Sequence, residues 1–318
     1  MYARRCAGAG WKLLRDALFV YVSLLKVMVP ALLVVKGLEW LGAIDWLGEM
    51  LSPLMNWLGL PDAMGLVWAA ALLTNIFTGL VVFFEVAGDM SLSVAQVTVL
   101  GVLMLVGHSL PVEGAVAKRA GVPWWVTVAL RLGGALVLGG ILHWVYSTGG
   151  LLQETAEIAW RPTAAPEGVL AWGVAQLRTL SLIYLIILGL MVLLAVLRHL
   201  GLERLIHFAL TPLLRVLGIG RSAANTTVIG FTLGLSYGAG LLIRDVDTGV
   251  MSRRDSFLAI CFLGLCHSVI EDTLLILLLG ADLTGVLWAR LLFACLVIAV
   301  LSRWPDGWRP ARWGRARV

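Results

Sequence analysis

The sequence predicts an all-α integral membrane protein built from two inverted-topology repeats. Three observations lead to this prediction: an apolar composition, a repeat of 159 residues, and the way positive charges fall between the apolar segments. The chain has 318 residues, of which 60% are hydrophobic and only 14% are charged, with a mean hydropathy of +0.94. Soluble domains carry about a quarter charged residues, and several apolar runs here reach the ~20 residues that span a bilayer. An ordinary soluble domain is therefore excluded.

Residues 159 positions apart match along most of the chain. His108-Ser109 lies opposite His267-Ser268 without a gap. Half of 318 is 159, so we predict two copies of one unit, residues 1–159 and 160–318. Further matched pairs are Glu113 with Asp272, Pro53 with Pro212, Gly59 with Gly218, Gly79 with Gly238, Ser93 with Ser252, Gly121 with Gly280 and Arg131 with Arg290.

Each copy opens with an apolar run long enough to cross the bilayer, at 17–36 and again at 176–197. The next segments, 38–60 and 202–219, are too polar to cross readily, and their apolar residues recur at helical spacing. This pattern predicts an amphipathic helix that lies at the membrane surface. A proline in the middle of each, Pro53 in the first copy, is expected to bend or break the helix.

The third segment of each copy is apolar but interrupted by small and polar residues. In 66–84 the interruptions are Thr74-Asn75 and Thr78-Gly79, whereas 222–243 is rich in glycine. Glycine lets a chain turn, and non-helical backbone inside a membrane must lie against protein or a wet cavity. We expect a re-entrant hairpin or a broken helix, although tight helix packing through small residues gives a similar pattern. Two crossing segments complete each copy, at 94–112 and 124–145, and at 256–275 and 284–302.

Positive charges, which favour the cytoplasmic side, indicate the topology. With about three crossings per copy, the acidic loop 146–175 falls outside and the tail 303–318, with its five arginines, falls inside on the anionic leaflet. The matched residues Glu85 and Arg244 differ in charge, as an inverted second copy requires, and only Lys36 is on the wrong side. Five crossings per copy would require the amphipathic segments to span. We predict a multi-pass protein of the bacterial inner membrane with both termini in the cytoplasm.

Several local patterns resemble a known family. They are Leu-Ser-Pro-Leu…Leu-Gly-Leu-Pro at 51–61, its echo Leu-Thr-Pro-Leu…Leu-Gly-Ile-Gly at 210–220, and Asn225-Thr226-Thr227…Gly238. With the inverted duplication, they resemble the nucleoside-recognition, or Gate, family, which is related to spore maturation proteins A and B and to the membrane part of the bacterial ferrous-iron transporter. The resemblance implies a transporter-like fold of helices and re-entrant hairpins, and it leaves the substrate open.

Ionisable residues inside apolar segments are costly in a membrane and indicate function. His267 and Glu271 are four residues apart, so on one helix they share a face and could hold a proton or a cation together with Asp272. We predict these three as a candidate metal site, although one histidine and two carboxylates are not a specific signature. The full set of predicted substrate-binding residues is His108, Ser109, Glu113, Arg131, Asn225, Thr226, Ser236, Tyr237, His267, Ser268, Glu271, Asp272, Arg290 and Asn75.

These residues predict a secondary transporter that moves a small polar or cationic solute through a mid-membrane site between the repeats. The sequence has no GxxxxGK[ST] motif, so energy would come from an ion gradient or from the substrate's own gradient. Two alternatives stay open: a translocator of an anionic lipid-linked substrate that meets Arg131 and Arg290, and a scaffold whose buried ion pairs only lock helices together.

An enzyme is not expected, because the adjacent His267 and Ser268 have poor geometry for a base and its nucleophile. We expect no cofactor beyond a coupling ion or a divalent metal. The expected partners are a small solute or ion and membrane lipids, with no nucleic acid, and a homodimer would be the commonest assembly.

Overall fold

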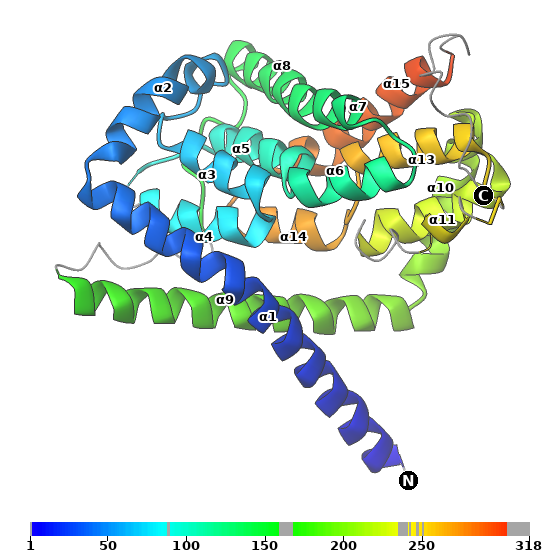
Figure 1. Ribbon diagram of the computed structural model, residues 1–318, viewed down its shortest axis with the longest axis horizontal. Coiled ribbons are helices and arrows are strands. Elements are labelled where there is room, and N and C mark those ends of the chain that lie inside the picture. Colours follow the sequence, from blue (N-terminus) through cyan, green and yellow to red (C-terminus); the bar gives the residue numbers. More distant parts are fainter. Residues whose placement is uncertain are drawn as a thin grey trace.

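The computed structural model describes the chain except for residues 1, 88–89, 159–167, 235–240, 242, 246–247, 250 and 304–318. Every regular element in the described part is a helix, and one isolated antiparallel bridge joins Ser93 to Thr155. The elements are α1 (Tyr2–Trp40), α2 (Ala43–Trp57), α3 (Met64–Leu73), α4 (Ile76–Val86), α5 (Val94–Gly107), α6 (Leu110–Arg119), α7 (Trp124–Val128), the π-helix η1 (Ala129–Gly133), α8 (Gly134–Gly149), α9 (Val169–His199), α10 (Leu202–Val216), α11 (Arg221–Leu233), α13 (Arg253–Leu265), α14 (Glu271–Leu277), the π-helix η2 (Thr284–Ala289) and α15 (Arg290–Ser302) (Figure 1).

Five helical stretches of the described chain are long and apolar enough to cross a membrane, which confirms an all-α, multi-pass architecture. The sixth predicted crossing, 256–275, is found as two shorter helices, α13 and α14, because the backbone leaves the helical path at residues 266–270. The five stretches are Leu13–Trp40, Val94–Arg119, Trp124–Gly149, Val169–His199 and Thr284–Ser302.

The two predicted amphipathic segments form α2 and α10, which lie at opposite ends of the molecule (Figure 1). Pro53 and Pro212 lie inside these helices, which continue past them, so the expected break is absent from both. Large apolar side chains remain exposed on each, such as Trp46 on α2 and Phe208 on α10, at 59% and 80%. Exposed aromatic side chains of this kind are typical of helices that lie in a membrane interface.

The interrupted segment of the first half is a helical hairpin. α3 and α4 pack so closely that a Cβ atom on Gly79 would lie 2.7 Å from the Cβ of Ala71. The turn occurs at Thr74-Asn75, where the Asn75 side chain caps α4 by accepting a hydrogen bond from the backbone N–H of Thr78 (2.9 Å). In the second half, α11 ends at Leu233, and the next residue, Gly234, has a φ of 87°, a backbone conformation that favours glycine.

The connection between the halves is shorter than the predicted loop 146–175. α8 continues to Gly149 and α9 begins at Val169. The described part of this connection is tied to the start of α5, where the N–H of Val94 donates to the carbonyl of Glu154 (2.9 Å). Most of the predicted basic tail, 304–318, lies outside the described residues.

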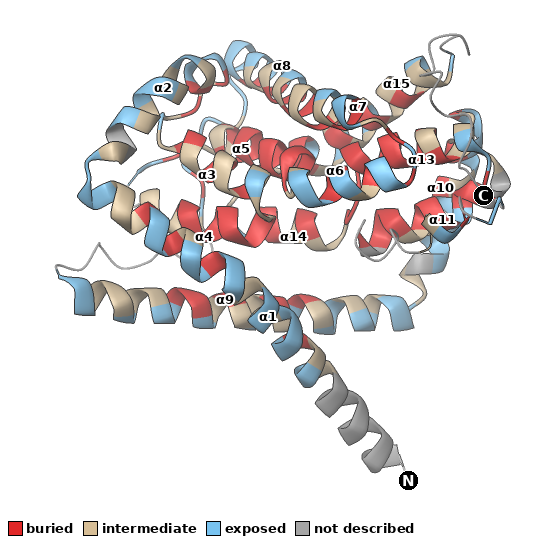
Figure 2. Cartoon of the chain, in the orientation of Figure 1, coloured by how far each residue is buried: buried red, intermediate tan, exposed pale blue. Residues whose placement is uncertain are grey.

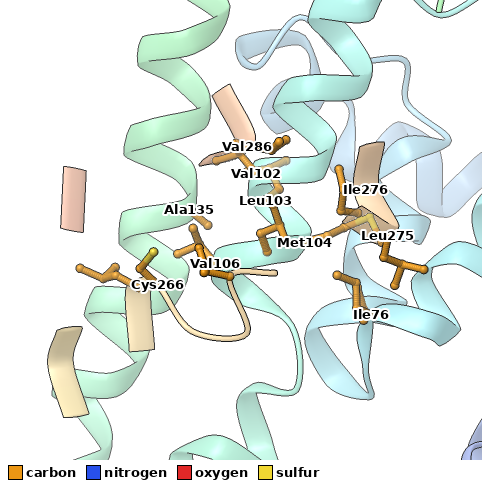
Figure 3. Close-up of a cluster of buried hydrophobic side chains, with 14 of the residues drawn as sticks. Ile76, Val102, Leu103, Met104, Val106, Ala135, Cys266, Leu275, Ile276 and Val286 are labelled. Carbon is orange, nitrogen blue, oxygen red and sulfur yellow. The ribbon is translucent and has the colours of Figure 1, made fainter. Parts of the chain in front are cut away.

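The core is centred on α5, which is buried along most of its length (Figure 2). Its contacts come from both halves of the chain. Met104 of α5 points toward Leu275 and Ile276 of α14 (Figure 3), and any Cβ on Gly101 would overlap the Cγ2 atom of Ile276. The packing of the two halves therefore places α5 of the first half directly against α14 of the second.

Candidate functional site

A histidine stands at a helix break in each half of the chain. α5 ends at Gly107, and His108 and Ser109 separate it from α6; in the second half His267 and Ser268 lie between α13 and α14. Both serines have positive φ angles, 53° and 49°. Such backbone costs about 1–3 kcal/mol and clusters at functional sites. Along the chain, His108 lies near the middle of the 26-residue stretch Val94–Arg119, one of those long and apolar enough to cross a membrane.

The interrupted segments support both breaks. The N–H of Ser109 donates to the carbonyl of Ala71 on α3 (3.0 Å), and the N–H of Val269 donates to the carbonyl of Phe231 on α11 (2.9 Å). These bonds satisfy donors that the broken helices have freed, as burial in a membrane protein requires. The hairpin and α11 therefore hold the breaks in place.

The two histidine side chains meet. Their Nε2 atoms are 3.3 Å apart and both residues are buried. Each Nδ1 atom lies against a carbonyl of its own helix, Met104 O for His108 (2.9 Å) and Leu263 O for His267 (2.7 Å). A carbonyl oxygen only accepts, so each Nδ1 carries the hydrogen, and in the neutral rings each Nε2 is an acceptor. Two lone pairs therefore face one another.

Two buried carboxylates complete the cluster by reaching across the halves. Oε1 of Glu113 lies 3.2 Å from Nε2 of His267 and 3.5 Å from Nε2 of His108. Oδ2 of Asp272 lies 3.7 Å from Nε2 of His108. Each carboxylate thus approaches the histidine of the opposite half, and neither half alone contains the site.

Two buried arginines bind the backbone carbonyl groups at the helix breaks. Nη1 of Arg131 forms an ion pair with Oε2 of Glu113, while its Nε and Nη2 donate to the carbonyls of Val106 (3.0 Å) and His108 (2.6 Å). Nη2 of Arg290 donates to the carbonyl of His267. Each guanidinium thus donates a hydrogen bond to a backbone carbonyl group that the helix break has left without a backbone N–H donor. Arg131 lies within η1 and Arg290 directly follows η2, and such π-bulges are frequent at functional sites.

The predicted metal set of His267, Glu271 and Asp272 is not the group that the structure assembles. The ligand atoms that lie within 4.8 Å of one another in the described chain belong to His108, Glu113 and His267. The prediction assumed one continuous helix through 267–271, whereas α14 begins only at Glu271. The break separates His267 from Glu271 and turns His267 toward the other half.

The polar residues of the interrupted segments have other partners. Asn75 caps α4. The exposed Asn225 contacts His207, with 2.9 Å between the Oδ1 atom of Asn225 and the Nε2 atom of His207. Buried Thr226 donates to Oδ2 of Asp245 (2.8 Å), a buried carboxylate that is not among the predicted site residues. Its position just after the glycine-rich segment 222–243 was the available signal. The predicted residues Ser236 and Tyr237 lie outside the described residues.

Two cavities differ in size and place. One of about 10 Å³, beside Glu113 and Arg131, holds about one water molecule. A polar cleft of about 350 Å³ lies at the N-terminal end of α5 and is lined by residues that include Gly59, Gln96 and His143. Of the cluster residues, only Glu113 and Arg131 line either of these two cavities, and the larger space lies at the N-terminal end of the α5 stretch.

Comparison with known proteins agrees with the architecture. Residues 180–281 match the model of the Gate family, described as nucleoside recognition. The chain is 32% identical over 302 residues to the uncharacterized membrane protein YvoD of Bacillus subtilis (strain 168), covering 92% of this chain and 94% of that protein. The chain belongs to the Gate family of membrane proteins. The matched region includes α11, α13 and α14, and hence His267 and Asp272. No solved structure matches the chain.

Proposed function

We propose that this Gate protein is a secondary transporter that moves a small polar or cationic solute through a mid-membrane site between two inverted repeats. The observation that carries the proposal is the buried cluster of His108, His267, Glu113 and Asp272 at two helix breaks. Broken helices that present polar groups near the bilayer midplane are the usual design of secondary transporters. The Gate family is associated with transport.

The proposed repeats, 1–159 and 160–318, are supported by elements that recur at the predicted offset. α2 and α10 begin and end 159 residues apart, as do the first residues of α5 and α13. The hydrogen bonds recur as well: the N–H of Glu113 donates to the carbonyl of Ser109, and that of Asp272 to the carbonyl of Ser268, each at 3.0 Å.

A two-fold relation between the repeats is supported by equivalent residues that touch. His108 and His267 are one such pair, and the hydroxyl of Tyr21 donates to the carbonyl of Leu180, 159 positions later (3.0 Å). The amphipathic helices α2 and α10 lie at opposite ends of the molecule (Figure 1). An axis in the membrane plane would put one amphipathic helix on each surface, as an inverted repeat requires.

Charge distribution supports the proposed placement in a bacterial inner membrane, with both termini in the cytoplasm. In this orientation the connection that carries Glu154 and Glu157 is outside, and the arginines at the start of α13 are inside. The proposed partners are the solute or ion and the surrounding lipids. In the absence of a nucleotide-binding motif, a gradient across the membrane would supply the energy.

Transport can be tested in proteoliposomes with a panel of nucleosides and divalent cations on one side and an imposed proton or sodium gradient. Asp272→Asn and His267→Ala are expected to abolish uptake of the solute that the unchanged protein moves, while both variants elute as folded protein. His199→Ala removes an exposed histidine at the end of α9 and serves as the matched control. Full uptake by folded Asp272→Asn and His267→Ala proteins would contradict the proposal and favour a structural role for the cluster.

A further inference from the structure

We propose that His108, His267 and Glu113 supply three ligands to a four-coordinate binding site for a divalent transition-metal ion. The inference deepens the proposed function by naming a cation class for its site. It rests on that function only for the role of the ion as cargo or coupling ion, because binding itself needs no transport.

The spacing of the three ligand atoms fits a tetrahedral ion. Nε2 of His108, Nε2 of His267 and Oε1 of Glu113 are separated by 3.3, 3.2 and 3.5 Å. Zinc bonds of ~2.0–2.2 Å at tetrahedral angles place neighbouring ligand atoms ~3.3–3.6 Å apart. Oδ2 of Asp272 lies 3.7 Å from Nε2 of His108 but outside the three ligand atoms that lie within 4.8 Å of one another, so the fourth position of the ion is left to a water molecule or to the solute. Calcium and magnesium prefer six or more oxygen ligands, so nitrogen donors favour zinc and its neighbours.

The surroundings of the ligands are those of a metal site. A metal-bound histidine almost always donates its other ring N–H to a carbonyl or carboxylate. Here both Nδ1 atoms do so, toward Met104 O and Leu263 O, and this fixes both Nε2 lone pairs toward the centre. Arg131 holds the outer oxygen of Glu113 in an ion pair, which leaves Oε1 directed at the histidines. Without a cation or an added proton, three acceptor atoms converge on one buried point.

Charge balance indicates an exchangeable ion. With both carboxylates ionised, Glu113 and Asp272 would balance the two positive charges of the buried Arg131 and Arg290. A divalent ion would add two positive charges in a buried place, which costs free energy. Binding should therefore be weaker than at a structural zinc site, as release during transport requires.

Cobalt(II) is the probe for the site, because four-coordinate Co²⁺ has intense visible absorption bands that the six-coordinate aqueous ion lacks. Full-length protein with its purification tag removed would be stripped with a chelator, dialysed and titrated with Co²⁺. We expect one equivalent to bind with four-coordinate bands, and Zn²⁺ to displace it. Six-coordinate bands only, or no saturable binding by the unchanged protein, would overturn the proposal without any variant.

Variants then assign the ligands. Loss of an outer-sphere partner alone lowers metal affinity about 10–100-fold, so His108→Ala and His267→Ala should each lower Co²⁺ affinity by at least ~100-fold. Glu113→Gln, which keeps the side-chain shape, tests the carboxylate if the alanine variants do not fold. Exposed His199→Ala should bind as the unchanged protein does. A folded Glu113→Gln or His267→Ala variant with unchanged affinity and spectrum would overturn the assignment.

Co²⁺ binding and proteoliposome uptake distinguish an error in the proposed metal site from an error in the proposed transport function. Uptake of another solute by proteoliposomes, with no Co²⁺ site in the same preparation, would overturn the metal site and leave the transporter. A four-coordinate Co²⁺ site in protein that moves none of the tested solutes would uphold the metal site and count against transport. Zn²⁺ uptake lost in Glu113→Gln would support both.

Discussion

Arg131 and Glu113 form a buried ion pair, and the effects of replacing them on the free energy of unfolding should be strongly coupled. Arg131 is only 1% exposed, pairs with Glu113, and donates to the carbonyls of Val106 and His108 at the break. Breaking a buried pair from one side costs about 3–5 kcal/mol, and each stranded carbonyl costs about 1–3 kcal/mol. Arg131→Met should therefore lower the free energy of unfolding by at least about 5 kcal/mol, from the lower ends of these ranges.

Glu113→Gln should cost about 3 kcal/mol, because it leaves the Arg131 guanidinium buried without its counter-charge. The double variant has no unpaired charge at this position. Its free energy of unfolding should therefore be about 2–3 kcal/mol higher than the sum of the two single-variant effects predicts. This value lies in the upper part of the range of interaction energies for residues in direct contact.

The assay is unfolding by SDS titration in mixed micelles, with a chelator present so that no bound metal contributes. The matched cycle is Asp272→Asn with Arg290→Met, the equivalent positions in the second half. In the described chain no ion pair within 4.0 Å joins Arg290 to Asp272, so their coupling should be smaller. Additive losses at Arg131 and Glu113, or equal coupling in the two cycles, would refute the reasoning.

Three further predictions concern topology, packing and backbone strain. Single cysteines at positions 154 and 253 should react with an impermeant thiol reagent only from outside and only from inside, respectively, and labelling of both from one side would contradict the inverted arrangement. Gly101→Val should cost about 1–3 kcal/mol by overpacking α5 against α14, whereas Gly189→Ala, with open space around it in α9, should be neutral or stabilising; equal effects in SDS titrations would contradict the packing. Ser109→Gly should raise stability by about 0.5–1 kcal/mol, because it relieves a positive φ angle at the cost of chain entropy, and a loss of stability would show that the serine side chain has a further role.

Much of the architecture follows from local features of the sequence. Apolar length identifies the long helices, and helical spacing of apolar residues identifies α2 and α10. The Thr74-Asn75 interruption becomes the turn between α3 and α4, because a side-chain cap is a local interaction. The sequence was less informative about where helices are interrupted by backbone geometry: Pro53 leaves α2 continuous, whereas the break at Ser268 divides α13 from α14.

The sequence alone identified the apolar helices, the 159-residue repeat and the ionisable residues His108, Glu113, His267 and Asp272 as candidates. Only the tertiary structure decided how these residues group. Helical spacing pairs His267 with Glu271, but the left-handed turn at Ser268 interrupts that helix and directs the imidazole toward the other half. Its neighbours there, His108 and Glu113, are more than 150 residues away along the chain. Contacts at such separation depend on how whole helices pack, and local sequence patterns do not encode that packing.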